Sequence, residues 1–369
     1  MSKIDKKVHE PLVHITKRDS MIWYKAWLVR AVAIIAALIV CALVIVFLTG
    51  YNPIEVYSAM IKGTFGSTRK IWISFQNVAM LLIISLAVTP AFKMRYWNLG
   101  AEGQVLIGAL ATAACMIMLG DKLPTVLLFI VMILASIVAG LIWAVIPAIF
   151  KAKWGTNESL FTLMMNYVAI QLVSFFVILW ENPKGSSTVG LINSNTNAGW
   201  MPSLFGQKYL LNIIVVVVIT VLMFIYLKYS KQGYEISVVG ESENTARYIG
   251  INVKKVIIRT VAISGALCGI AGLLLVSGTD HTISTNTAGG QGFTAIIVSW
   301  LAKFNPFIMM LTSFLIIFLQ RGAGEIATTF RLNESVADIL TGIILFFIIG
   351  CEFFINYKLN FRSSTKEGK

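Results

Sequence analysis

The run VLLFIVMILASIVAGLIWAVIPAIF, at 126–150, contains no charged residue. It is longer than the ~20 residues that an α-helix needs to cross the hydrocarbon core of a bilayer. Apolar runs of spanning length recur along the chain. They are continuous, whereas the strands of a membrane β-barrel alternate apolar and polar residues. The run therefore predicts one spanning helix of an all-α, polytopic membrane protein.

The composition of the whole chain agrees with this prediction. Of the 369 residues, 57% are hydrophobic and 13% are charged, and the mean hydropathy is +0.80. A soluble domain of this length could not bury so much apolar surface. We expect about ten membrane segments, counting one that is too short to span. They lie at about 28–49, 71–90, 105–119, 126–150, 158–180, 209–227, 256–277, 292–301, 307–319 and 336–354.

The net charge of +13 reports topology rather than a nucleic-acid partner. With a cytoplasmic N-terminus, most of the 30 Lys and Arg residues fall in segments on the inner side, as the positive-inside rule requires. We therefore expect both termini to be cytoplasmic and no nucleic acid to be bound. The predicted organisation is a cytoplasmic leader at 1–27, a transmembrane domain at 28–357 and a basic cytoplasmic tail at 358–369.

Cysteine and histidine residues give no sign of a metal or redox site. The four cysteines are far apart in apolar runs, and we interpret them as small hydrophobic residues. They are Cys41, Cys115, Cys268 and Cys351. His281 lies in a polar stretch without a pattern of metal ligands, so we expect a solvated loop histidine.

A polar island at 229–255 separates two predicted spans on the cytoplasmic side. Within it, residues 241–249 are expected to form a short helix, because acidic residues beginning at Glu241 open it and Gly250 follows as a C′ glycine. A short helix between two spans is well placed to contact a partner outside the membrane. An ordinary solvated loop is the alternative.

The stretch YWNLGAEGQ, at 96–104, interrupts an apolar context with two glycines and several polar residues. Broken backbone at membrane depth is tolerated where it lines a cavity or is covered by protein, and transporters build sites at such breaks. An interfacial turn is the alternative. A second break at Gln291–Gly292 starts the short segment, and the pair is consistent with two related halves.

The predicted span at 158–180 begins with a capping sequence and carries an amide inside the membrane. Thr156 or Asn157 is a suitable N-cap, with Glu158 in the first turn. Asn166 lies about two turns further on, where its carboxamide needs a partner. Thr162 shares its helical face. The amide either lines a path or bonds a neighbouring helix.

Four of these stretches, taken in chain order, resemble one family. They are NLGAEGQ at 98–104, NESLFTLMMNY at 157–167, VGESENTARYIGI at 239–251, and GFTAI followed by NP at 292–306. The chain resembles the permeases of bacterial ABC importers in the branched-chain amino acid, ribose and nucleoside superfamily. The stretch at 157–167 is similar to the nucleoside branch. Trp97 departs from the family pattern, which has Phe there.

The resemblance implies a permease subunit of an ATP-driven nucleoside importer, multi-pass in the bacterial cytoplasmic membrane and working by alternating access. It implies no enzymatic activity and no cofactor on this chain, with ATP on partner subunits; the sequence has no phosphate-binding GxxxxGK[ST] loop. The implied partners are two ATP-binding cassette subunits, a second permease (like or unlike), an extracytoplasmic solute-binding protein and the lipid bilayer.

The resemblance also implies residue roles. The polar island, at 230–255, becomes a coupling loop that docks on the ATPase. Its coupling residues are Glu241, Asn244, Ala246, Arg247, Tyr248 and Gly250. The residues expected along the substrate path are Asn98, Glu102, Gln104, Phe161, Asn166 and Tyr167, with amides to bond the substrate and aromatic rings to stack on a base.

A secondary transporter driven by protons or sodium is the alternative class. Such a transporter needs an acidic residue within the membrane. Glu102, Glu158 and Asp338 are candidates, and all three fall near the ends of predicted spans. A channel is disfavoured because no filter-like element repeats.

Overall fold

The computed structural model describes residues 13–18 and 21–361 and is helical through most of that length. Nine of its helices are long and apolar enough to cross a membrane, and α11 is apolar but shorter. The predicted all-α class and segment number are therefore confirmed for the described residues. The helices are α1 (Trp23–Thr49), α2 (Pro53–Phe65), α3 (Thr68–Lys93), α4 (Ala101–Leu119), α5 (Thr125–Trp154), α6 (Glu158–Leu179), α7 (Leu210–Tyr229), α8 (Lys231–Glu241), α9 (Glu243–Tyr248), α10 (Val253–Leu275), the π-helical turn η1 (Val276–Asp280), α11 (Gln291–Leu301), α12 (Pro306–Thr329) and α13 (Glu334–Asn356).

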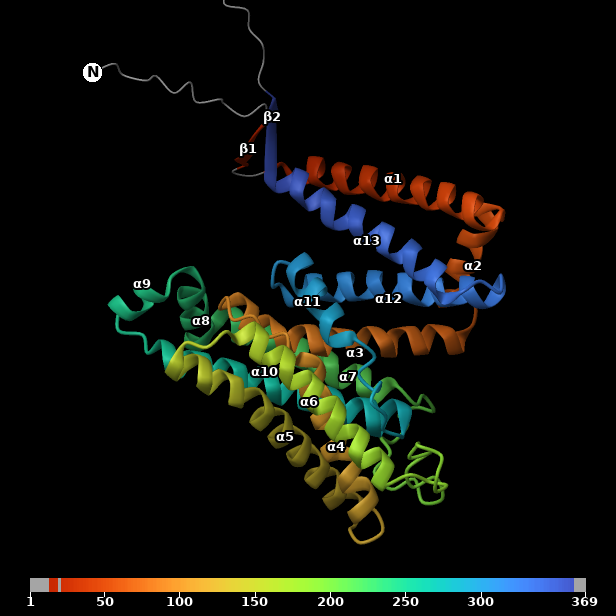
Figure 1. Ribbon diagram of the computed structural model, residues 1–369, viewed down its shortest axis with the longest axis vertical. Helices are drawn as coiled ribbons and strands as arrows, with labels where there is room; N and C mark the ends of the chain where they lie inside the picture. The colour runs from red at the N-terminus through yellow and green to blue at the C-terminus, as the bar shows by residue number, and fades with distance from the viewer. Residues whose placement is uncertain (1–12, 19–20, 362–369) are drawn as a thin grey trace, which may run out of the picture. The chain divides into compact units, whose positions relative to one another are not determined.

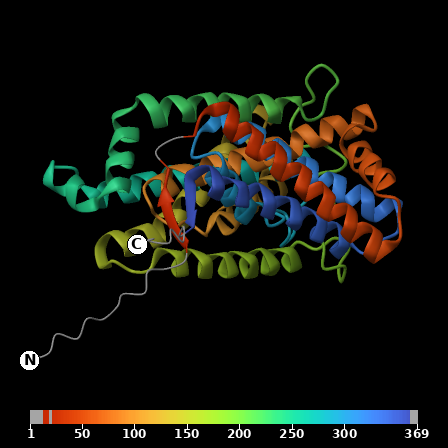
Figure 2. The same ribbon diagram turned by 90° about the horizontal axis from the view of Figure 1, so that it is seen from above.

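The chain divides into two compact units. A central unit runs from Thr68 to Phe318, and a terminal unit combines the chain up to Ser67 with the chain from Leu319 onward. Within the central unit, α8 and α9 lie at one end of the helix bundle, and the loop between α6 and α7 lies at the other end (Figures 1 and 2).

Helix α10 is the core of the central unit, packed against α3, α4 and α5. Glycines allow this close packing. A Cβ atom on Gly269 would meet the backbone oxygen of Ser136 in α5, and one on Gly265 would meet that of Gly140. On the α4 side, a Cβ on Gly272 would meet the backbone of Val105. Three helices therefore approach within backbone contact.

The terminal unit pairs the first and last spans. Helices α1 and α13 run side by side (Figure 1), and Arg30 bonds Glu352 between them at 2.6 Å. Beyond these helices, strands β1 (Val13–Lys17) and β2 (Tyr357–Phe361) form an antiparallel ribbon. The sequence indicated only a leader and a tail here, since five-residue strands carry little pattern. The remainder of those segments, at 1–12, 19–20 and 362–369, lies outside the described residues.

Helix α12 corrects the predicted end of the ninth span. The sequence indicated a span at 307–319, but α12 continues to Thr329. Small residues explain the extension, because a Cβ on Gly322 would run into Met60 of α2, and one on Gly63 would meet Glu325. Tertiary packing against α2 therefore keeps the polar second half of α12 helical.

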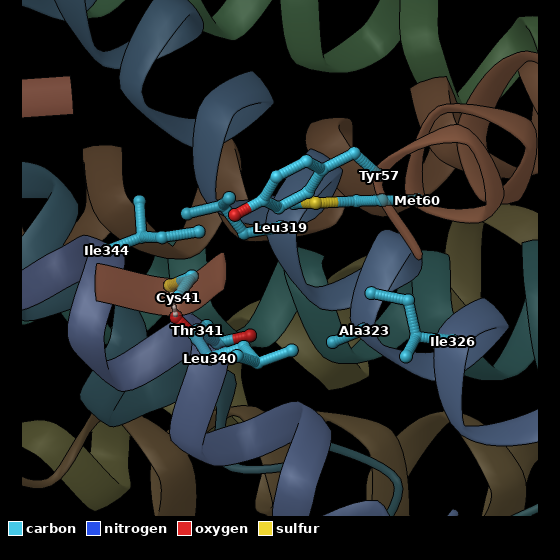
Figure 3. Close-up of a pocket in the computed structure, with 9 residues that line it drawn as sticks. All are labelled: Cys41, Tyr57, Met60, Leu319, Ala323, Ile326, Leu340, Thr341 and Ile344. Atoms are coloured by element: carbon cyan, nitrogen blue, oxygen red, sulfur yellow. Dashed lines mark hydrogen bonds between the residues drawn. The ribbon is translucent and has the colours of Figure 1, made fainter. Parts of the chain in front are cut away.

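A small cavity in the terminal unit lies among α1, α2, α12 and α13 (Figure 3). Its volume is about 10 Å³, room for little more than one water molecule. Tyr57 donates a hydrogen bond from its hydroxyl to Leu38 O. Burial, followed by the nearby Cys41, raises the pKa of Tyr57 to about 12, so this donor stays protonated. The cavity is too small for a transported solute.

Candidate functional site

The broken segment between α3 and α4 is buried and held by side chains of two other helices. Asn98 is fully buried, and its Nδ2 donates to Ser264 Oγ of α10 at 3.2 Å. Gln104 Nε2 donates back to Asn98 Oδ1 at 3.1 Å, and the same oxygen accepts from Gly100 N at 3.1 Å. The break is covered by protein, as non-helical backbone within a membrane must be.

Helix α6 holds the other side of this segment. Asn166 Oδ1 accepts from Gly103 N and its Nδ2 donates to Leu99 O, both at 2.8 Å. One turn earlier, Thr162 Oγ1 accepts from Leu99 N at 3.1 Å and donates to Glu158 O at 2.7 Å. The predicted polar face of α6 therefore exists, and it bonds the neighbouring backbone. The amides of Asn98, Gln104 and Asn166 are all engaged within the chain.

Glu102 connects the two predicted breaks. Its side chain is only 8% exposed. Its Oε1 accepts from Gly290 N and its Oε2 from Gly292 N, both at 2.8 Å, at the start of α11. A carboxylate is favoured there, because the first N–H groups of a helix lack partners and the helix dipole is positive. The sequence does not reveal that Gly290 and Gly292 donate to this carboxylate.

The two aromatic rings expected on the path lie apart from this buried polar cluster. Phe161 packs against Phe150 of α5, with ring centroids 5.0 Å apart. It lines an apolar groove of about 350 Å³ along the first turns of α6, together with Met164 and Met165. Tyr167 is 60% exposed. The structure thus gathers four of the six expected path residues into one buried cluster and places the two aromatic residues on other faces of α6.

The polar island contains two helices, and the predicted coupling helix at 241–249 corresponds to the second of them, α9. Ser242 has an extended backbone and its Oγ accepts from Thr245 N at 3.2 Å, so it is the N-cap of α9. Glu241 therefore ends α8 rather than opening the coupling helix, because a capping hydroxyl fixes the start more strongly than acidic composition does. Gly250 has φ +86° and follows the C-cap Ile249, which confirms the expected C′ glycine.

Every side chain of α9 except one is exposed at the surface of the protein. Tyr248 is 92% exposed, and Arg247 pairs with Glu243 one turn away at 3.2 Å. Asn244, Glu241 and Gly250 are exposed as well. Ala246 is the exception, because it is fully buried among Met94, Tyr96, Val239 and Val253 of its own chain. Its small size serves this internal packing, which corrects the expected contact with a partner.

A polar pocket lies directly beneath α9. Lys151 at the end of α5 pairs with Glu158 at the start of α6 at 2.7 Å, and Arg95 and Glu243 line the same pocket. Tyr96 is also part of its lining. Burial, followed by the negative Glu158, raises the pKa of Tyr96, so its hydroxyl is neutral. Asn157 caps α6 by accepting from Leu160 N at 3.1 Å, which confirms the predicted capping sequence.

In the loops opposite α9, the predicted loop histidine contacts an aromatic ring. His281 is stacked on Trp200, with ring centroids 3.8 Å apart and planes at 4°. Ile192 N donates to His281 O at 2.8 Å. The histidine is therefore a loop residue, as predicted, but it is partly buried and stacked rather than fully solvated. The aromatic partner lies far away in sequence, so spacing alone did not reveal the contact.

The residues that the structure describes give no support for a metal site. There, no group of three His, Cys, Asp or Glu side chains could hold a metal ion. All four cysteines are free, and three of them are buried.

Comparison with known proteins agrees with this architecture. Residues 72–349 match the family described as "Branched-chain amino acid transport system / permease component". The chain belongs to this family. It is accordingly a multi-pass permease component of the cytoplasmic membrane, a transport protein and not an enzyme.

Relatives with assigned names are similar over nearly their whole length. A glucose ABC transporter permease of Haloferax volcanii, TsgB13, is 28% identical, with 90% of each chain covered. A nucleoside ABC transporter permease of Lactococcus lactis, NupB, is 27% identical over 87% of this chain and 90% of its own. A guanosine ABC transporter permease of Bacillus subtilis, NupP, is 28% identical over 87% of this chain and 92% of its own.

Proposed function

We propose that the chain is the transmembrane permease subunit of an ATP-driven importer of nucleosides. Association with ATPase and solute-binding subunits is a general property of the family; the proposed complex contains two ATP-binding cassette subunits, a second permease (like or unlike) and an extracytoplasmic solute-binding protein. ATP is bound by the partner subunits, and both termini face the cytoplasm. No cofactor and no nucleic acid is bound by this chain.

The exposed helix α9 is the observation that supports the proposal of an ATP-driven transporter. A short helix with a 92% exposed tyrosine, rigidly capped at both ends, is suited to insert into a groove of a partner. The proposed docking surface consists of Glu241, Asn244, Arg247, Tyr248 and Gly250. On docking, Arg247 breaks its ion pair with Glu243 and pairs with a carboxylate of the ATPase. Breaking the first pair costs little free energy, because exposed ion pairs are weak.

Docking is tested with Tyr248→Ala and, as a matched control, Tyr234→Ala. Tyr234 is also an exposed tyrosine, 62% accessible, but it belongs to α8. We expect ATPase subunits to co-purify with wild-type permease and with Tyr234→Ala, and to be lost from Tyr248→Ala at equal permease yield. Co-purification with Tyr248→Ala at the wild-type level would contradict docking through α9.

The nucleoside part rests on the relatives and on the stretch at 157–167. Two of the relatives above are named for nucleosides or guanosine and one for glucose, all at similar identity. A nucleoside adds an aromatic base to the sugar, and a base stacks on aromatic side chains. The groove on α6, with Phe161 in its wall and Tyr167 further along the helix, offers such surfaces. Asn98, Glu102, Gln104 and Asn166 border the path by fixing its broken segment.

The substrate class is tested by competition in cells that carry the complete transporter. We expect uptake of labelled guanosine to be inhibited by excess unlabelled uridine and to be unaffected by excess glucose. Phe161→Ala should weaken guanosine uptake with little effect on the amount of permease in the membrane. Inhibition by glucose as strong as that by uridine would contradict a nucleoside transporter.

A further inference from the structure

Helix α11 is held at both ends by one stretch of chain, residues 93–102, which we call the joining segment. At the start of α11, Glu102 accepts from Gly290 N and Gly292 N, both at 2.8 Å. At its other end, Trp300 stacks on Trp97, with ring centroids 5.7 Å apart and planes at 25°. The joining segment therefore contacts α11 at both of its ends.

The contact at Glu102 leaves no room for independent movement. A Cβ atom on Gly292 would lie 2.8 Å from Cα and Oε2 of Glu102. The carboxylate is buried, and hydrogen bonds to a charged group in a buried site are roughly twice as strong as neutral ones. Near the other end, Ser299 Oγ lies 2.9 Å from Thr89 Oγ1 of α3. The contacts at Glu102 and Trp97 therefore tie α11 to the joining segment, and the contact at Ser299 ties it to α3, which leads into that segment.

The opposite end of the joining segment is packed under α9. Met94 and Tyr96 belong to the same buried cluster as Ala246 of α9 and Val239 of α8. A Cβ atom on Gly240 of α8 would run into Lys93 O, so these backbones also touch. A displacement of α9 must therefore reach residues 93–96 directly.

We propose that the joining segment makes α9 and α11 move as one body, and that Glu102 is the positioning residue that ties α11 to it. The proposal rests on the proposed docking of an ATPase on α9. Helix α11 is too short to span the membrane, so a shift transmitted from α9 displaces a half-helix within the central unit rather than a whole span. Glu102 acts through α11 and does not bind substrate.

Coupled motion is tested by the distance between spin labels on Thr245→Cys of α9 and Thr294→Cys of α11. The chain carries Ala in place of its four native cysteines and is assembled in the complete transporter. We expect the α9–α11 distance to stay unchanged when ATP binds, and to shift or broaden in Glu102→Gln. If the α9–α11 distance changes with ATP in the spin-labelled chain that retains Glu102, the proposal is overturned. This measurement does not depend on whether Glu102→Gln folds.

The effect of the Glu102 contact on transport is tested with Glu102→Gln, and Glu181→Gln is the matched control. Glu181 also accepts from two backbone N–H groups, Gly185 N at 2.9 Å and Ser187 N at 3.2 Å, but in the exposed loop between α6 and α7. In proteoliposomes, we expect Glu102→Gln to lower uptake about tenfold or more while ATP hydrolysis changes less than about twofold, because one buried bond to a charged acceptor is lost. Glu181→Gln should retain both activities.

Two results of the transport test would overturn the assignment. In one, uptake and hydrolysis by Glu102→Gln fall in proportion, as expected of a residue that only stabilises the fold. In the other, uptake is unchanged. Failure of the docking proposal is seen separately, because ATPase subunits would then remain bound to Tyr248→Ala.

Discussion

Asn166 illustrates how single side chains stabilise a broken backbone inside a membrane. Its oxygen satisfies the N–H of Gly103 and its amide nitrogen satisfies the carbonyl of Leu99. Neither backbone group has water available, so an unsatisfied partner is costly. The asparagine is therefore first a structural residue, and any effect on transport passes through the geometry of the break.

Replacing Asn166 by Ala should destabilise the protein measurably. The buried N–H of Gly103 and the part-buried carbonyl of Leu99 lose their partners, and an unsatisfied buried group costs about 1–3 kcal/mol. Gln171→Ala is the matched control, because Gln171 is an exposed carboxamide in the same helix. Thermal unfolding in detergent should show a lower midpoint for Asn166→Ala and almost no shift for Gln171→Ala. Equal midpoints for the two variants would contradict a structural role for Asn166.

We expect His281 to make the loop layer opposite α9 sensitive to acid. Burial, followed by the positive charge of Lys208, lowers the pKa of His281 below its usual value. Because its pKa is lower in the folded protein, the unfolded chain binds a proton first as the pH falls. The stability from the neutral, stacked imidazole is present above about pH 6.5 and is lost as the pH falls from there toward the folded pKa.

Thermal unfolding between pH 7.5 and pH 5 measures this effect. We expect the midpoint to fall on acidification, and to fall less in His281→Phe, which keeps an aromatic ring on Trp200 without a titrating group. Lys208→Gln should raise the pKa of His281, because the repelling charge is gone. Identical pH profiles for the wild type and His281→Phe would show that His281 does not cause the acid sensitivity.

At the scale of elements, the sequence predicts what is local and fails where tertiary contacts decide. The spans, the cap at Asn157 and the glycine ending α9 follow from length, hydropathy and capping rules. The extension of α12 to Thr329 does not, because packing against α2 outweighs its polar residues. The same limit applies to the site. The break at 96–104 is visible in the sequence, but the pairing of Glu102 with Gly290 joins residues far apart in the chain.

The packing of α10 on α5 gives a test at this scale. Gly269→Ala places a Cβ atom against Ser136 O, and overpacking of this kind typically costs about 1–3 kcal/mol. Gly350 of α13 has open space around it, so Gly350→Ala should be neutral or stabilise by up to about 1 kcal/mol through helix propensity. Denaturation in detergent should separate the two variants. A neutral Gly269→Ala would show that α5 and α10 are not in backbone contact.

At the scale of the whole molecule, the described residues include nine helices able to cross a membrane and the exposed helix α9, which we propose as the docking helix. The sequence has no phosphate-binding loop, and the described residues hold no metal cluster. An ion-driven transporter would need a free acidic group in the membrane. Glu102 and Glu158 are instead engaged as a helix cap and as an ion pair with Lys151. The side chain of Asp338, the third candidate, lies outside the described residues.

The energy source of guanosine uptake tests the account most directly. Proteoliposomes containing the chain with its ATPase, permease and binding-protein partners allow ATP and ion gradients to be set separately. We expect accumulation of labelled guanosine that requires ATP on the ATPase side, persists when proton and sodium gradients are collapsed, and is absent with Tyr248→Ala. Uptake that follows an ion gradient without ATP and is unaffected by Tyr248→Ala would contradict the account and identify a secondary transporter.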